Sequence, residues 1–279
     1  MVKIITDSTC NLDDELLARH DVRVAPIAIQ FGEQTFEEGI DIDRDAFYSR
    51  IERTGRIPTT SQPSPSWFER FYRQVHAQGD QALVITVTAK HSGTYQSALL
   101  AKAMVPQASV AVFDSASISL GTGWMVVEAA RASERGQPLA SILERLDHIR
   151  RHLHLVITPA TLKYLQMSGR VGKLQGTLAS LLDVKPIIAV RDGLLEAGER
   201  VRTRSKALHH LVDYIQEHTR SATAVNLAVI HARAPEDGQH LLDLARRVLP
   251  VREVLIADLV ASLAVHGGPG VVGLGAYPV

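Results

Sequence analysis

The sequence has a single cysteine, Cys10, among its 279 residues. One thiol can form neither an internal disulfide nor a thiolate metal cluster, and this usage is typical of a reducing cytosol. No uncharged apolar run reaches the roughly 18 residues of a spanning helix. The first residues have a charge followed by only a few apolar side chains, unlike a signal peptide. We therefore expect a cytoplasmic protein with no membrane span.

An excess of charge of either sign is also missing, because 30 Lys and Arg balance 30 Asp and Glu. No block of five or six like charges occurs. Nucleic-acid binding normally requires a basic patch or stripe, which this sequence does not have. We therefore expect a small molecule or a protein as the partner, and no nucleic acid.

Motifs for metal and nucleotide binding are absent as well. His152 and His154, and the pair His209 and His210, have no acidic or cysteine ligand at zinc spacing. Neither the P-loop nor the G-x-G-x-x-G fingerprint follows a predicted strand. We expect no metal site and no cofactor.

The first half of the chain alternates between strand and helix patterns. Apolar runs at residues 2–6, 82–88 and 109–113 predict strands, and residues 94–104 and 119–135 predict helices. Asn11 is expected to cap a helix that ends near residue 20. Residues 22–31 contain Pro26 and predict an edge strand, with a hairpin turn at Gly32 and Glu33. This alternation favours an α/β fold with an N-terminal Rossmann-like parallel sheet and flanking helices.

The second half has a different pattern from about residue 154 onward. Asp192 and Gly193 predict a hairpin between residues 186–191 and 194–201. The other predicted elements are strands at 153–157, 225–231 and 253–258, helices at 205–218 and 235–248, a helix with Leu162 and Leu165, a helix with Leu178, Leu181 and Leu182, and a glycine-rich tail from residue 266. A hairpin within a β-α run predicts a C-terminal α+β domain with a mixed or antiparallel sheet.

The change of pattern places the domain boundary near residue 155. We expect an N-terminal α/β domain at 1–155, with an edge hairpin near 22–40, and a C-terminal domain at 156–279. Ligands of parallel sheets bind beyond the carboxyl ends of the strands. Three hydroxyl-bearing loops follow such ends, at residues 7–9, 91–93 and 114–117.

Ser92 stands next to His91 at the predicted start of a helix, and its role has three interpretations. Serines often cap helices, and a hydroxyl beside helix N–H groups can hold a carboxylate or phosphate. A nucleophile would need a base, an orienting acid and oxyanion donors, and the G-x-S-x-G elbow is absent. His266 precedes a run of glycines, so its imidazole is either a core group or a group held over an anion.

Seven blocks, in order along almost the whole chain, change the weight of these interpretations. They are TDSTCNL at 6–12, PTTSQPSP at 58–65, SGTYQSA at 92–98, FDSASISLGTG at 113–123, SGRVGKL at 168–174, VRTRSKAL at 201–208 and HGGPGVVGLG at 266–275. Together they resemble the signature blocks of the DegV family. These bacterial fatty-acid-binding proteins serve as the acyl-carrying subunit of fatty acid kinase.

The resemblance implies a long-chain fatty acid buried between two domains, with Thr60, Ser92 and His266 at its carboxylate. Ser61 and Gly93 belong to the same carboxylate-binding candidates. A separate ATP-dependent kinase subunit would phosphorylate the bound acid to an acyl phosphate for phospholipid synthesis, so the chain would not be an enzyme by itself.

Two further points follow from the resemblance and from the residues. Family resemblance makes Arg170 and Arg202 candidates for docking the kinase. The alternative function is a serine hydrolase that acts on acyl esters through Ser92 and His266. The sequence does not distinguish palmitate or oleate from a branched or hydroxylated acid.

Overall fold

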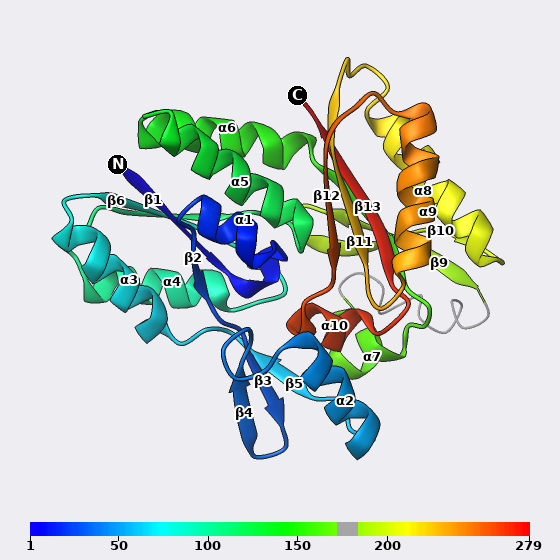
Figure 1. The fold of residues 1–279 in the computed structure, drawn as a ribbon, viewed down its shortest axis with the longest axis horizontal. Coiled ribbons are helices and arrows are strands. Elements are labelled where there is room, and N and C mark those ends of the chain that lie inside the picture. The colour runs from blue at the N-terminus through cyan, green and yellow to red at the C-terminus, as the bar shows by residue number, and fades with distance from the viewer. Residues whose placement is uncertain (172–183) are drawn as a thin grey trace.

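A computed structural model describes residues 1–171 and 184–279. Its first sheet has four parallel strands in the order β2-β1-β6-β7, namely Arg23–Ala25, Val2–Asp7, Gln81–Thr86 and Val110–Asp114. Helices α3 (Pro65–Ala77) and α4 (Thr94–Met104) pack on one face, and α5 (Leu120–Glu134) packs on the other (Figure 1). The short helix α1 is Asp14–Arg19. The predicted N-terminal parallel sheet with flanking helices is confirmed.

The second sheet has six strands in the order β10-β9-β8-β13-β11-β12. These strands are Leu194–Val201, Lys185–Arg191, His154–Thr158, Val272–Pro278, Val225–His231 and Val251–Asp258. Only β11 and β12 pair in parallel, so the sheet is mixed, as predicted. Helices α8 (Arg204–His218) and α9 (Pro235–Val248) cover one face. Helix α5 contacts strands of both sheets, and α6 (Leu139–His152) packs beside it (Figure 1).

A third, three-stranded sheet lies apart from the first two (Figure 1). It consists of β4 (Gln34–Glu37), β3 (Ala28–Phe31) and β5 (Thr59–Ser61), and α2 (Arg44–Thr54) follows β4 along the chain. The hairpin turn at Gly32 and Glu33 is confirmed. The single strand predicted for residues 22–31 is wrong, because the chain leaves the first sheet after Ala25 and re-enters strand structure at Ala28. Pro26, which has no N–H, stands at this break.

Asn11 does not cap α1, contrary to the prediction. Asp13 does so, accepting a hydrogen bond from the Leu16 N–H. Asn11 instead follows the 3-10 helix η1 (Ser8–Cys10) with φ of 59°, and its Oδ1 accepts a hydrogen bond from the Val260 N–H at 2.7 Å. Asparagine tolerates this left-handed conformation better than most residues. Asn11 therefore joins the first sheet to the start of helix α10 (Ala261–Gly267).

The glycine-rich tail is also different from the prediction. Its residues form the end of α10 and strand β13, which lies between β8 and β11 near the middle of the six-stranded sheet. A Cβ at Gly273 would lie 2.7 Å from Ile157 Cγ2, so the glycine makes room for the side chain of β8. Helix α7 (Lys163–Ser168) contains Leu165 and begins directly after Leu162, so the helix predicted around these two leucines is confirmed. Helices α6 and α10 and strand β5 are further elements that the sequence analysis did not predict.

Three remaining expectations concern the chain as a whole. No helix in the described residues is long and apolar enough to cross a membrane. The helix expected around Leu178, Leu181 and Leu182 lies outside the described residues. The boundary between 155 and 156 stays a prediction, and strand β8 runs across it.

Candidate ligand-binding site

A cavity lies between the first and the six-stranded sheets. Its wall is mostly apolar and comes from both sides. The first sheet supplies Val87 and Ile118 from the loops after β6 and β7, and the six-stranded sheet supplies Ile157, Leu195 and Ile230. Such a lining is typical of sites for small apolar ligands.

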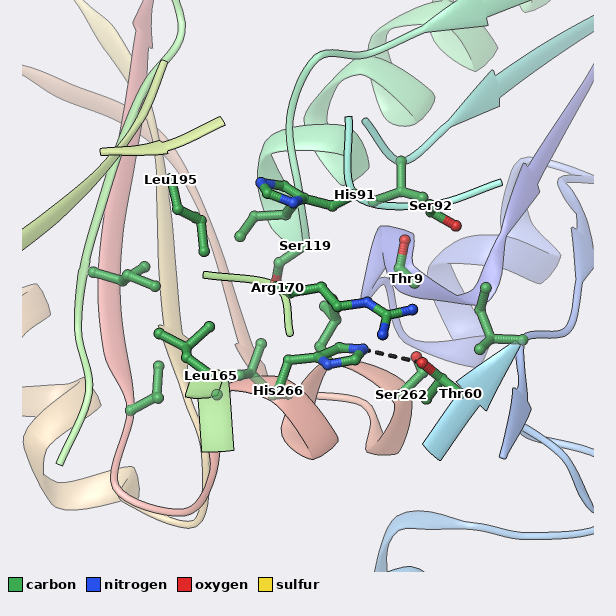
Figure 2. A pocket seen from close by; sticks show the side chains of 18 of the residues that line it. Thr9, Thr60, His91, Ser92, Ser119, Leu165, Arg170, Leu195, Ser262 and His266 are labelled. Carbon is green, nitrogen blue, oxygen red and sulfur yellow. Dashed lines mark hydrogen bonds between the residues drawn. The ribbon is translucent and has the colours of Figure 1, made fainter. Parts of the chain in front are cut away.

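One end of the cavity carries the polar residues that the sequence analysis singled out. Thr60, Ser61, Ser92, Gly93 and His266 all line it. Thr60 Oγ1 and His266 Nε2 are 3.0 Å apart and share a hydrogen bond, although 206 positions separate the two residues. Figure 2 shows this bond, with Ser92 on the adjoining wall. The structure therefore brings together the five predicted residues from β5, the β6–α4 loop and α10.

Local structure holds the Ser92 hydroxyl at the start of α4. Ser92 Oγ lies 2.8 Å from Thr94 Oγ1 and accepts a hydrogen bond from the Thr94 N–H at 3.3 Å. A Cβ at Gly93 would lie 2.9 Å from Gln62 Cδ, so glycine lets this loop approach the loop after β5. Among the residues that the structure describes, Ser92 has no imidazole partner. This geometry gives no support to the hydrolase alternative, which requires a base beside the serine.

His266 lies in the last turn of α10. Gly268 is the residue directly after α10 and has φ of 74°. A Cβ at Gly268 would lie 2.2 Å from Tyr164 Cδ2, so only glycine fits there. Burial, followed by the nearby charges of Arg170 and His91, lowers the pKa of His266 to about 4. The imidazole is therefore neutral at neutral pH, with one N–H donor and one acceptor nitrogen. Its Nδ1 has no hydrogen-bond partner in the described part of the chain.

The two predicted docking arginines occupy different places. Arg170 lines the cavity, where its guanidinium points toward the labelled hydroxyl residues (Figure 2). Its Nη1 donates a hydrogen bond to the Ser168 carbonyl at 2.7 Å. Arg202 is exposed in the connection between β10 and α8 and does not line the cavity. Kinase docking by either arginine stays a prediction.

Three hydroxyl residues that were not named as site residues also line the cavity, namely Thr9, Ser119 and Ser262. Thr9 comes from one of the hydroxyl-bearing loops predicted beyond the strand ends. Ser119 stands two residues after the end of another such loop, so the position of these loops was a usable signal. Ser262 lies in α10, which was not predicted.

Glu38 is a buried carboxylate behind this polar end. It accepts hydrogen bonds from Ser8 Oγ at 2.5 Å, from Ser262 Oγ at 2.6 Å and from the Ser262 N–H at 2.6 Å. No basic side chain pairs with it among the described residues. Burial raises the pKa of Glu38, against the opposing effect of its hydrogen bonds. Glu38 thus ties the loop after β4 to the start of α10, and no sequence motif had indicated it.

No cluster of three or more His, Cys, Asp or Glu side chains in the described residues could hold a metal ion. His152 ends α6, and His154 begins β8 with its ring 4.7 Å from that of His218. Burial lowers the pKa of His154 to about 4. The described histidines therefore give no sign of a metal centre.

Comparisons with known proteins agree on one family. The family model of DegV proteins matches residues 1–279. A DegV domain-containing protein of Deinococcus radiodurans is 31% identical over 278 residues, which cover 100% of this chain and 99% of the relative. A solved DegV family protein of Thermus thermophilus, described by its fatty acid binding, has a TM-score of 0.94 and 32% identity, covering 100% of this chain and 99% of its own.

A second solved structure is a stearic acid-binding protein of Eubacterium ventriosum. It has a TM-score of 0.90 and 30% identity, and the match covers 100% of this chain and 98% of the other. The family model, the relative and the two solved structures thus match this chain over its whole length. The chain belongs to the DegV family.

Proposed function

We propose that this protein binds a long-chain fatty acid in the cavity between its sheets and presents the carboxylate to a separate ATP-dependent fatty acid kinase. The observation that carries the proposal is the composition of the cavity, which is apolar along its wall and hydroxyl-rich at one end. This polarity corresponds to that of a fatty acid. The fatty acids named for the Thermus and Eubacterium proteins support the same ligand class.

The apolar wall accounts for the affinity. Burial contributes about 0.8 kcal/mol per methylene, so about 14 methylenes supply on the order of 11 kcal/mol before the costs of ordering. A buried carboxylate without hydrogen bonds would cancel much of this gain. The polar end therefore decides whether a fatty acid binds better than a plain hydrocarbon.

Thr60 and Ser92 would each direct a hydroxyl proton to the carboxylate, and His266 would hold Thr60 in that orientation. A hydroxyl that donates to the ligand must accept the Thr60–His266 hydrogen bond, so His266 Nε2 carries the proton. The neutral state of His266 is compatible with this arrangement. Ser92 already shares a hydrogen bond with Thr94, which fixes the side chain in place.

Phosphorylation of the bound carboxylate would be the task of another protein. The sequence contains no P-loop for ATP. The hydroxyl end and Arg170 lie at the same end of the cavity, where an incoming phosphoryl group would meet the carboxylate. The product would be an acyl phosphate that feeds phospholipid synthesis.

Mass spectrometry of the protein purified from bacteria tests the binding step. We expect about one equivalent of fatty acid that is present under native conditions and released by denaturation. Ser92→Ala should keep the fold and lose ligand. A protein that stays empty after incubation with mixed fatty acids would contradict the proposal, and an acyl group covalently attached at Ser92 would favour the hydrolase.

The kinase step has its own test. The fatty-acid-loaded protein, ATP and a bacterial fatty acid kinase subunit are mixed, and hydroxylamine traps the acyl phosphate. Product is expected only when all three are present. Binding without any phosphorylation would leave a fatty-acid-binding protein and remove the kinase role.

A further inference from the structure

Besides His266 Nδ1, two buried polar atoms lie in the wall of the cavity without a protein partner. They are His91 Nε2 and Ser119 Oγ, and neither has a hydrogen bond within the described residues. Ser119 is only 1% exposed. A buried polar group without a partner costs roughly 1–3 kcal/mol, so such groups in a ligand cavity indicate a polar atom on the ligand.

The backbone at Ser119 turns its side chain away from an ordinary capping role. Ser119 is the N-cap residue of α5, yet its side chain makes no capping hydrogen bond. Its φ of 51° and ψ of −139° are unfavourable for a residue with a Cβ, and glycine adopts such angles at lower cost. The protein therefore keeps a serine in a strained conformation where the hydroxyl faces the cavity rather than the helix.

His91 is held in place by the loop after β6. The backbone N–H of His91 donates a hydrogen bond to the Thr88 carbonyl at 3.3 Å, and Thr88 Oγ1 donates one to the Gly193 carbonyl in the β9–β10 turn at 3.1 Å. In Figure 2 the His91 ring points toward the side where Leu195 lies, and the Ser92 hydroxyl points the other way. Burial, followed by the charge of Arg170, lowers the pKa of His91. The imidazole is thus a neutral hydrogen-bonding group in the wall of the cavity.

The spacing of these groups limits where the ligand's polar atom lies. His91 and Ser92 are neighbours, with Cα atoms about 3.8 Å apart. In Figure 2 the His91 ring lies between Ser92 and Leu195, so an acyl chain that runs from Ser92 toward Leu195 passes this ring first. In Figure 2 Ser119 lies between the His91 and His266 rings, on the same route toward Leu195 and Leu165.

We propose that His91 and Ser119 form a subsite for a hydroxyl group near the carboxyl end of the acyl chain, so that the ligand class is a 2- or 3-hydroxy fatty acid. The inference rests on the proposed fatty acid binding. A hydroxyl can accept a hydrogen bond from one of the two groups and donate to the other. A plain acyl chain would leave both unpaired.

Competition binding tests this subsite. Palmitate, 2-hydroxypalmitate, 3-hydroxypalmitate and 16-hydroxypalmitate are titrated against the delipidated protein. At least one of the 2- and 3-hydroxy acids should bind about tenfold more tightly than palmitate, which is the gain from satisfying the two groups. The 16-hydroxy acid should bind more weakly than palmitate, because its hydroxyl is buried among apolar side chains.

Two variants separate the subsite from the rest of the cavity. His91→Leu removes the nitrogen and keeps the bulk. Ser119→Gly removes the hydroxyl and relieves the positive φ, so it should be at least as stable as the wild type. Both should lose the preference for the hydroxy acid, whereas Ser92→Ala should weaken palmitate and hydroxypalmitate by a similar factor.

If the wild type binds palmitate as tightly as, or more tightly than, both 2- and 3-hydroxypalmitate, the inference is overturned and fatty acid binding still stands. A preference that persists in both His91→Leu and Ser119→Gly would also overturn it. If none of the four acids binds, the proposed function fails together with it.

Discussion

The polar end of the cavity has one carboxyl group of the protein, Glu38, and one proposed position for a ligand carboxylate, and the two differ in their hydrogen-bond donors and nearby charges. Glu38 is a carboxyl group of the protein itself, enclosed by two serine hydroxyls and one backbone N–H. The proposed ligand site has the hydroxyls of Thr60 and Ser92, a neutral imidazole and the guanidinium of Arg170 in its wall. Ser262 borders both, but its O–H is already donated to Glu38.

The difference in donors and charge corresponds to a structural role for Glu38 and a ligand-binding role for the proposed site. Glu38 connects β4 to α10, so a closed set of donors is sufficient and no exchange is needed. In the proposed function a ligand carboxylate enters, reacts and leaves, and a site made of single hydroxyls with a cation close by would permit each step. If this comparison is correct, changes at the ligand site should alter affinity strongly, and changes at Glu38 should act indirectly through α10.

Thr60→Val should have the largest effect, because it removes a donor to the ligand carboxylate and keeps the shape of the side chain. A hydrogen bond to a charged group is worth about 1.5–3 kcal/mol, so the Kd for palmitate should rise about 10- to 100-fold. Calorimetric titration measures this change.

The neighbouring Thr59 offers a matched control, since it lies on the same strand and hydrogen-bonds with Gln30 Oε1 at 3.2 Å. Thr59→Val should leave the Kd within about twofold, as expected for a single weak surface interaction. Equal losses in the two variants would mean that Thr60 acts through strand stability alone.

Glu38→Gln should weaken palmitate binding less, by about fivefold, which corresponds to one ordinary hydrogen bond. The amide can accept from the Ser262 N–H but no longer accepts from all three donors, so the start of α10 and with it His266 should shift. The ¹³C shift of carboxyl-labelled palmitate should move in this variant. Glu37→Gln, next to it, should change neither measurement, and an unchanged ¹³C shift in Glu38→Gln would remove the positioning role.

The pH dependence of stability should have opposite signs at His266 and Glu38. The pKa of His266 is lowered to about 4, so its contribution is complete above pH 6.5 and is lost as pH falls toward 4. The pKa of Glu38 is raised above its ordinary value of 4.5 by burial. The protonated carboxyl is not destabilising below that pH, and the stability of the protein falls as pH rises above it.

Urea unfolding of the ligand-free protein between pH 4 and 7 measures both effects. Wild-type stability minus that of His266→Gln should rise with pH, and wild-type stability minus that of Glu38→Gln should fall. Slopes of the same sign would show that the two groups do not differ in the way that their burial indicates.

Arg202→Glu should have the smallest effect on affinity, because Arg202 is exposed and outside the cavity wall. The Kd for palmitate should stay within about twofold. If Arg202 docks the kinase, acyl phosphate formation by the loaded variant should fall severalfold. Unchanged turnover would remove that role.

Elements that begin or end at capping residues, glycine or proline were predictable from the sequence. Helix α2 begins after Asp43 and ends before Gly55, and α3 begins with Ser64 as its cap and Pro65 in the first turn, as these residues indicate. Strand β13 was missed because glycines normally weaken strands. Here they leave space for side chains of β8, which no local pattern reveals.

The site was predictable only in part. Spacing indicated hydroxyl loops at the ends of parallel strands, whereas the grouping of Thr60, Ser92 and His266 came from the family resemblance. Glu38 could not be found this way, because its partner Ser262 is 224 positions away and belongs to a helix too short to show periodicity. Such pairs arise from tertiary packing and have no signal in a single sequence.

The position of β13 has a consequence for how the chain acquires its structure during synthesis. Strands β8 and β11 are separated by 66 residues and by the place that β13 fills. While residues 272–278 are still inside the ribosome, β8–β10 and β11–β12 are two fragments with open edges. Closing the sheet is a contact of high sequence separation, which makes it slow. We expect the first sheet to be formed on the ribosome well before the cavity has its second wall.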